Sequence, residues 1–270
     1  MIHRSETPPE GFSSGEAPVL VRAWPEGRIL NGFLGRHGGV SRGAYATLNL
    51  GAWVGDDPAA VEENWRRVRS RFPAATIFAR MNQVHGSEVR VVTRANATER
   101  SPADGMVTET EGIALGVFTA DCVPILIIDQ SRGVAGALHA GWRGTLAGIV
   151  QSGLDAMARL GASLSNIRVA LGPSIGVCCF EVDGELAERF AREIPGTDRH
   201  VRDGRPGKAY VDLRGIVREQ LVGAGVARGA ISQIGPCTRC AADRYFSRRA
   251  AGGITTGLQM SVVGLAADRE

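Results

Sequence analysis

The chain has 270 residues, of which 44% are hydrophobic and 22% charged, and its formal net charge is +3 at pH 7. This balance is ordinary for a globular protein, and the Lys and Arg residues are spread along the chain, so no nucleic-acid partner is indicated. No apolar run reaches the ~18 residues that cross a membrane, and the first residues lack the apolar stretch of a signal peptide, so no membrane partner is expected. Five cysteines, an odd number, do not suggest a disulfide framework, and we expect a cytoplasmic protein.

The first part of the chain contains a tail, a glycine-rich stretch and a helix. Residues 1–18 are rich in Ser, Pro, Glu and Gly, and we expect them to form a flexible tail. Residues 32–55 combine many glycines with short apolar pieces, which predicts turns and short strands. A helix is predicted over 58–72, because apolar residues recur at helical spacing after Pro58 and proline suits a first helical turn.

The remainder alternates between predicted strands and helices. Short β-branched apolar runs predict buried strands, and longer stretches with apolar residues at helical spacing predict helices. The predicted strands are 77–78, 89–92, 113–117, 123–128, 133–138, 167–171, 231–234 and 258–264, and the predicted helices are 146–160, 184–194 and 212–223. This alternation, with no repeat or low-complexity linker, predicts an α/β or α+β class with a mixed sheet, in a single domain over 19–270.

Cys122 and His139 stand at the ends of two predicted buried strands, where loops expose side chains from a rigid frame. Zn²⁺ binds Cys and His readily, and three protein ligands with one open position are typical of a catalytic zinc that lowers the pKa of a bound water to about 7. His85, held by a Gln-Val-His-Gly turn between two apolar segments, is the best third ligand. The other histidines lie in less suitable places: His3 in the tail, His37 in a glycine-rich turn and His200 in a polar stretch.

Two other interpretations of these residues stay open. Cys122 could be a nucleophile with His139 as its base and Asp121 as the group that orients it, or a buried thiol without chemistry.

Further along, Pro236–Cys240 resembles half of the nucleobase-deaminase signature, but no histidine is followed two residues later by glutamate. Of a redox pair, a structural metal pair and two unrelated thiols, the last is favoured for Cys237 and Cys240.

Several blocks of the sequence resemble, in order, those of the YfiH family, which has been called a laccase-domain or multicopper polyphenol oxidase family and later a purine nucleoside phosphorylase family. The resemblance covers roughly residues 30 to 264, and the blocks are long and unusual. They are Gly38–Ser41, Tyr45–Gly51, Gly55–Asp56, Gln83–Gly86, Thr119–Cys122, His139–Gly144, Gly172–Gly176, Phe180–Val182, Cys237–Thr238 and Phe246–Arg249.

The resemblance implies a function and a cofactor. The family's His-Cys-His zinc triad falls on His85, Cys122 and His139, which would be both metal ligands and catalytic residues. The implied activity is phosphate-dependent cleavage of adenosine, inosine and methylthioadenosine, with adenosine deamination beside it, so the expected partners are purine nucleosides and phosphate. The implied fold is a single α/β domain with layered sheets and helices, shared with certain bacterial toxin deamidases.

Three residues are predicted to contact the substrate. Arg143, near the expected start of a helix, is a candidate phosphate clamp, since helix N-termini and arginine both favour anions. Asn49 and Gln83 are candidate contacts to base or ribose. Arg143 could equally be a surface ion-pair residue, and Asn49 a turn-capping side chain. The chain departs from the family at Trp65 and Leu258, where arginine is usual.

Other functions compete with nucleoside cleavage. A true multicopper oxidase needs more histidines than the five present, although copper in the His-Cys-His site could give weak polyphenol oxidase activity. A Cys- or zinc-dependent hydrolase that edits peptidoglycan precursors would use the same residues. A non-catalytic zinc protein is the fourth interpretation, and an open fourth metal position argues against it.

Overall fold

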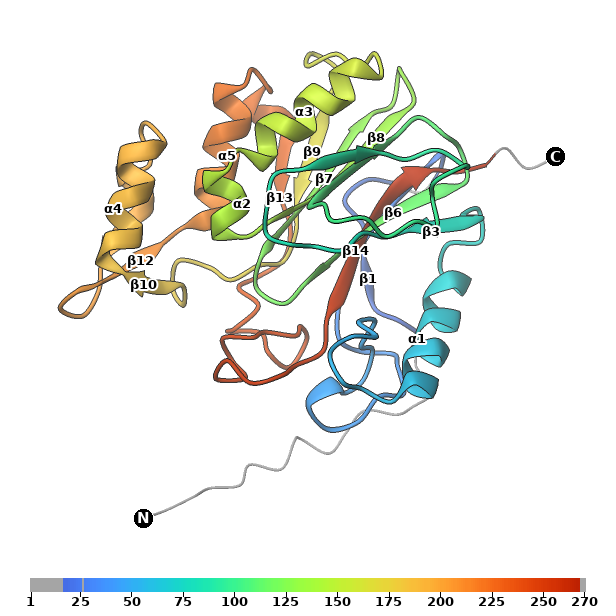
Figure 1. The fold of residues 1–270 in the computed structure, drawn as a ribbon, viewed down its shortest axis with the longest axis horizontal. Coiled ribbons are helices and arrows are strands. Elements are labelled where there is room, and N and C mark those ends of the chain that lie inside the picture. Colours follow the sequence, from blue (N-terminus) through green and yellow to red (C-terminus); the bar gives the residue numbers. More distant parts are fainter. Residues whose placement is uncertain (1–16, 26, 268–270) are drawn as a thin grey trace.

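Two β-sheets lie face to face at the centre of the computed structural model, which describes residues 17–25 and 27–267 (Figure 1). Except for residues 17 and 18, the predicted tail lies outside the described residues. A third, smaller sheet lies to one side. The five-stranded sheet has the order β1 (Leu20–Val21), β2 (Ile29–Leu34), β14 (Gln259–Leu265), β6 (Ile113–Thr119) and β3 (Ile77–Ala79). The six-stranded sheet has the order β13 (Ile231–Gln233), β9 (Arg168–Leu171), β7 (Val123–Asp129), β8 (Val134–Ala140), β5 (Gly105–Thr108) and β4 (Val89–Val91). The small sheet is β10 (Glu181–Asp183), β12 (Lys208–Val211) and β11 (Val201–Asp203).

Helices cover the two outer faces of the paired sheets. Helix α1 (Pro58–Ser70) packs on the five-stranded sheet, and α3 (Ile149–Arg159) and α5 (Leu213–Gly223) pack on the six-stranded sheet. The short helix α2 (Trp142–Leu146) follows β8, and α4 (Gly184–Glu193) packs with the small sheet and projects at one end (Figure 1). The predicted class is confirmed: the fold is mixed α/β, with helix, sheet, sheet and helix layers.

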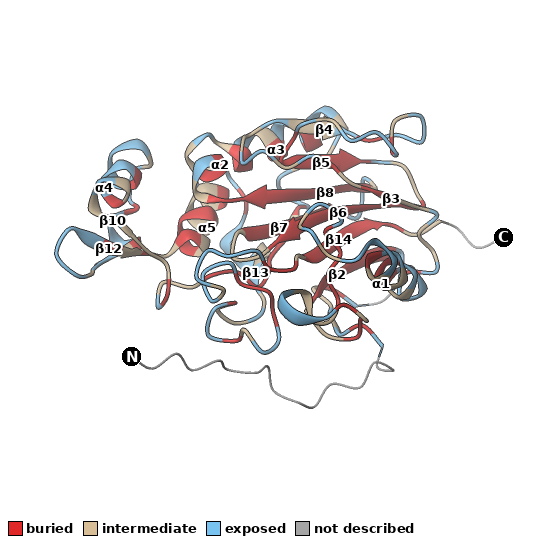
Figure 2. Ribbon diagram, turned by 60° about the horizontal axis from the view of Figure 1, so that its bottom comes forward, coloured by how far each residue is buried: buried red, intermediate tan, exposed pale blue. Residues whose placement is uncertain are grey.

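The continuous apolar run of strand β7 follows from its position between two hydrophobic clusters. Ile125 and Ile127 contact the cluster under α3 and α5, whereas Leu126 and Ile128 contact the cluster between the two sheets. Alternate side chains of a strand point to opposite faces, so a strand covered on both faces is buried along its length (Figure 2), and β7 is apolar from Val123 to Ile128. Burial of each such side chain contributes about 1.5–3 kcal/mol.

Helix α1 confirms the predicted helix after Pro58. The Asp57 carboxylate accepts a hydrogen bond from the Ala59 N–H at 2.9 Å, and Pro58 occupies the first turn. Trp65 faces the sheet and is only 2% exposed, with its indole N–H donating to the Leu50 carbonyl at 3.1 Å.

The structure differs from the prediction in three places. The expected helix over 146–160 is divided into α2 and α3, because Gly148 adopts a left-handed φ of 85° between them. Strands β1, β2 and β5 and the whole small sheet were not predicted. After β2, residues 35–57 form loops and one 3₁₀ turn, Gly43–Tyr45, rather than short strands.

No helix within the described ranges is both long and apolar enough to span a membrane.

Candidate metal centre and substrate pocket

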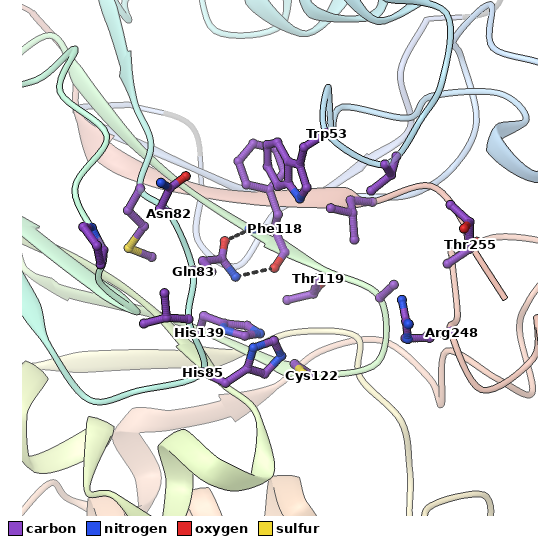
Figure 3. A pocket seen from close by; sticks show the side chains of 17 residues that line it. Trp53, Asn82, Gln83, His85, Phe118, Thr119, Cys122, His139, Arg248 and Thr255 are labelled. Atoms are coloured by element: carbon purple, nitrogen blue, oxygen red, sulfur yellow. Dashed lines mark hydrogen bonds between the residues drawn. The ribbon is translucent and has the colours of Figure 1, made fainter. Parts of the chain in front are cut away.

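The register of two neighbouring strands, β7 and β8, brings Cys122 and His139 together. Cys122 immediately precedes β7, and in the antiparallel pair Val123 lies opposite Ala140 and Pro124 opposite His139. The thiol and the imidazole therefore lie at the same end of adjacent strands. His85 reaches them from the loop after β3. The ligand atoms of His85, Cys122 and His139 all lie within 4.8 Å of one another (Figure 3).

A buried carboxylate, Asp104, organises two of these residues. Asp104 directly precedes β5, and its Oδ1 lies 2.7 Å from His139 Nδ1. Both side chains are buried, at 0% and 3% exposure. The carboxylate fixes the imidazole proton at Nδ1 and leaves Nε2 for a metal, an arrangement that is common for metal-bound histidines.

The same carboxylate holds the turn that carries His85. It accepts hydrogen bonds from the backbone N–H groups of Val84, His85 and Gly86 at 3.1, 3.0 and 2.7 Å. His85 itself adopts a positive φ of 61°, which is uncommon for a residue other than glycine. Three backbone donors to one carboxylate thus stabilise an uncommon backbone conformation that turns the imidazole toward Cys122.

The electrostatics of the three donors favour a thiolate. Burial raises the pKa of the Cys122 thiol, but charge interactions and hydrogen bonds with His139 and His85 outweigh it and bring that pKa to about 6. Burial lowers the pKa of His139, but the Cys122 thiolate and Asp104 raise it to about 9. The thiolate is the form of cysteine that binds metals.

Two glycines of the Gly141–Gly144 segment leave room for the donors. A methyl group on Gly141 would lie 2.9 Å from His85 Cδ2 and 3.1 Å from Cys122 Sγ. A methyl group on Gly144 would lie 2.7 Å from the Gly86 carbonyl oxygen, so α2 can pack against the His85 turn only without a side chain there. One thiolate, two imidazoles and the free space beside them fit a small divalent cation, and this group could hold a metal ion.

The three donors lie at the edge of a cavity of about 860 Å³ (Figure 3). On the other side, Trp53 and Phe118 meet edge to face with their ring centroids 5.1 Å apart. The Trp53 side chain is 55% exposed and therefore accessible to a ligand. Arg248 also lines the cavity, together with Thr119, whose buried Oγ1 has no hydrogen-bond partner in the described part of the chain. The cavity thus combines aromatic faces, one cation, one unsatisfied hydroxyl and the three donors.

The three predicted substrate contacts have different positions. Gln83 lines the cavity, but its amide is bound to the Phe118 backbone in both directions at 2.8 Å. Asn49 is fully buried outside the cavity lining, where it bonds Gly51 and Leu258 backbone groups and the Asp56 carboxylate.

Arg143 also lies outside the cavity lining. Its side chain is exposed, and its guanidinium lies 4.1 Å from the Trp142 ring centroid. Of the three residues predicted to contact substrate, the structure therefore brings only Gln83 to the cavity.

Asp121 does not orient His139, contrary to the nucleophile hypothesis. Its carboxylate accepts hydrogen bonds from the Thr238 hydroxyl at 2.6 Å and from the Arg249 backbone N–H at 2.7 Å. Asp104 takes the orienting position instead. No motif pointed to Asp104, which lies in none of the family-like blocks, whereas Arg248 belongs to the Phe246–Arg249 block.

The departures at Trp65 and Leu258 have structural consequences of different kinds. Trp65 is a core residue of α1, and the neighbouring Arg66 is exposed and paired with Glu63 at 2.6 Å, away from the cavity. Leu258 lines the cavity, so the wall is apolar where the family usually has a cation.

Comparisons with known proteins agree with this architecture. The family model described as multi-copper polyphenol oxidoreductase laccase matches residues 30–266. A protein from Deinococcus radiodurans named purine nucleoside phosphorylase is 41% identical over 247 residues, covering 91% of this chain and 92% of that protein. A protein from an unknown prokaryotic organism, named adenosine deaminase RL5, is 37% identical over 221 residues, covering 78% and 84%.

Solved structures show the same fold. YlmD from Geobacillus stearothermophilus superposes with a TM-score of 0.86 at 34% identity, covering 96% of this chain and all of that chain. The Bacillus licheniformis protein YfiH gives a TM-score of 0.85 at 30% identity, covering 92% and 96%. Together with the family model over residues 30–266, these matches confirm that the chain belongs to the laccase-like YfiH family.

Proposed function

We propose that this chain is a zinc-dependent purine nucleoside phosphorylase that cleaves adenosine, inosine and methylthioadenosine with phosphate and also deaminates adenosine. The observation that carries the proposal is the set of three convergent donors at the edge of an 860 Å³ cavity with aromatic walls. The names of the two relatives, a purine nucleoside phosphorylase and an adenosine deaminase, support the substrate class. A cytoplasmic setting, where nucleosides and phosphate are present and thiols stay reduced, suits this chemistry.

His85, Cys122 and His139 would hold the metal. Three protein ligands leave a position open, and a zinc ion there supplies Lewis-acid chemistry and lowers the pKa of water. Asp104 keeps the His139 proton on Nδ1 through the 2.7 Å contact, so that the imidazole is neutral and correctly turned when the metal is bound.

The purine would bind between the donors and the aromatic wall. Trp53 and Phe118 offer apolar ring surface. Every nucleobase has a flat π-face that can stack on an aromatic side chain. The Thr119 hydroxyl, buried and unsatisfied within the described residues, would gain a hydrogen bond from a polar ligand. The apolar side chain of Leu258 also lines this cavity and suits the flat, weakly polar faces of a purine.

Arg248 would hold the phosphate. Its guanidinium lines the cavity and can form two parallel hydrogen bonds with a phosphate. In phosphorolysis a phosphate oxygen forms a bond to C1′ of the ribose while the bond from C1′ to the purine nitrogen breaks, and the purine leaves with the electron pair and takes up a proton. Arg248 would place the phosphate on the ribose side of the cavity.

Product analysis tests the proposal. Zinc-loaded protein is incubated with adenosine, with and without phosphate, and adenine, inosine and ribose 1-phosphate are separated by chromatography. Adenine and ribose 1-phosphate that appear only with phosphate support phosphorolysis, and inosine in both samples supports deamination. If folded, zinc-loaded protein forms none of these products, the proposal is wrong, and amides of peptidoglycan precursors are the next substrates to assay.

Two arginine variants separate the candidate phosphate contacts. We expect Arg248→Ala to raise the KM for phosphate by about 10- to 100-fold, since a hydrogen bond to a charged group contributes about 1.5–3 kcal/mol. Arg143→Ala, which removes an exposed guanidinium stacked on Trp142, is the matched control and should leave the KM for phosphate unchanged. The opposite pattern would assign the phosphate to Arg143, as the sequence predicted.

A further inference from the structure

Four cysteines from two distant segments converge at a second place in the molecule. Cys178 and Cys179 lie in the loop between β9 and β10, and Cys237 and Cys240 lie in the loop that follows β13. Their sulfur atoms all lie within 4.8 Å of one another, and none is in a disulfide. From the sequence we expected Cys237 and Cys240 to be two unrelated thiols. No sequence feature linked them to Cys178 and Cys179, some 60 residues earlier.

The spacing of the sulfurs suits one central atom. Cys240 Sγ lies 3.6 Å from Cys178 Sγ and 3.4 Å from Cys179 Sγ, so a single thiol faces two others. A disulfide would require one of these pairs to close to about 2.05 Å, whereas a shared metal ion holds both pairs near their present separations. Four sulfurs at about 2.3 Å from a tetrahedral zinc lie about 3.8 Å apart, which is close to the observed separations.

A positively charged side chain and a close approach of the two loops mark the surroundings of the cluster. The Arg239 guanidinium lies 3.5 Å from Cys179 Sγ, where its positive charge favours a thiolate. A methyl group on Gly176 would lie 3.2 Å from Cys237 Cβ and 3.3 Å from Cys178 Sγ, so a side chain there would push the two loops apart by a few tenths of an ångström. Donors of this kind stabilise thiolates, which are the metal-binding form.

We propose that Cys178, Cys179, Cys237 and Cys240 form a second metal site, a structural zinc bound by four thiolates. Four protein ligands close the coordination shell, as in structural rather than catalytic zinc sites. The proposal does not depend on the activity assigned to the His85–Cys122–His139 centre, because it uses none of those residues.

The position of the cluster gives the zinc a structural task. Cys237 pairs with Ser174 in an isolated bridge, so the two loops already lie side by side. The next residue, Thr238, donates its hydroxyl hydrogen bond to Asp121, and Ile175 donates its N–H to the Asp121 carbonyl at 2.8 Å. Asp121 has a positive φ of 99° and directly precedes Cys122. A zinc that ties the two loops together would therefore also hold the backbone that presents Cys122 to the first centre.

Zinc stoichiometry of the full chain tests the proposal. Protein is reduced, loaded with zinc, desalted without oxygen and assayed for bound metal. We expect two zinc ions per chain in the wild type, one in His85→Ala, and one in the double variant Cys237→Ser/Cys240→Ser. His85→Ala is the matched variant, because it removes an exposed ligand of the first centre and leaves all four clustered thiols.

X-ray absorption at the zinc edge keeps the test independent of the double variant, which could fail to fold. In zinc-loaded His85→Ala we expect a shell of sulfur neighbours only, at about 2.3 Å. Mixed nitrogen and sulfur neighbours, or no zinc at all in this variant, would overturn the proposal. A Cys237→Ser/Cys240→Ser variant that binds as much zinc as the wild type, or clustered thiols that resist a thiol reagent until a disulfide reductant is added, would overturn it as well.

Discussion

Replacement of Asp104 by asparagine tests the origin of the first metal centre's geometry. The two carboxylate oxygens each serve two partners: Oδ1 faces His139 Nδ1 and the His85 N–H, and Oδ2 faces the Val84 and Gly86 N–H groups. Asparagine keeps the size of the side chain but turns one oxygen into an NH₂ group, so two donors lose their acceptor. Hydrogen bonds to a charged group contribute about 1.5–3 kcal/mol each, so the loss is at least about 3 kcal/mol.

If the whole of this loss fell on the metal-bound state, zinc binding would weaken by roughly 100-fold, since about 1.4 kcal/mol is a factor of ten. The value lies at the upper end of the roughly 10- to 100-fold expected when the hydrogen-bond partner of a metal ligand is removed. Competition with a chromophoric chelator measures the affinity of the first centre, and it is best done in a variant that lacks the four-cysteine cluster.

Asp129→Asn is the matched control. Asp129 is equally buried and also accepts backbone N–H groups, from Ser131, Arg132 and Ser163, but it lies at the other end of β7 from Cys122. Both variants should lower the free energy of unfolding, and only Asp104→Asn should weaken zinc binding. Equal zinc affinities in the two variants would refute the role assigned to Asp104.

Three further predictions follow from other contacts. Gly141→Ala should weaken zinc binding by about tenfold or more in chelator competition, because its methyl group crowds Cys122, whereas Gly223→Ala, with open space around it, should not. Trp53→Ala should raise the KM for adenosine by about tenfold in steady-state kinetics without changing the zinc content, because base stacking contributes about 1–3 kcal/mol. Arg228 and neighbouring arginines hold the pKa of Glu219 near 2, below its unfolded value, so this carboxylate stabilises the fold above pH 4.5 and the benefit is lost as pH falls toward 2. In chemical denaturation, the difference in unfolding free energy between wild type and Glu219→Gln should therefore shrink over that interval, and a difference independent of pH would contradict this sign.

The fold was predictable where a segment's burial is uniform. The run Val123–Ile128 is apolar at every position because β7 is covered on both faces, and its strand was predicted nearly to its ends. The strand β5, Gly105–Thr108, has only four residues and begins with glycine, so it carries no periodic signal. The small sheet was missed for the same reason, since its strands are short and partly exposed.

The candidate site was predictable in its ligands and less so in its surroundings. His85, Cys122 and His139 are chemically conspicuous residue types, and strand ends are where such groups can converge. Asp104 and the cavity wall are not conspicuous, because their roles depend on strand register and on loops that come together only in the folded chain. Asn49 is the opposite case, a residue that looked like a substrate contact from the sequence. It lies in a family-like block, but it is fully buried and hydrogen-bonds to neighbouring loops.

The most direct test of the central claim is a zinc titration of metal-free protein in which adenine release from adenosine is measured in phosphate buffer. The account predicts that the rate rises with zinc and reaches a plateau in the wild type. It also predicts that His85→Ala, which keeps the four clustered cysteines, releases no adenine at any zinc concentration. A rate that does not respond to zinc, or a His85→Ala variant with wild-type turnover, would contradict the assignment of His85, Cys122 and His139 as the catalytic centre.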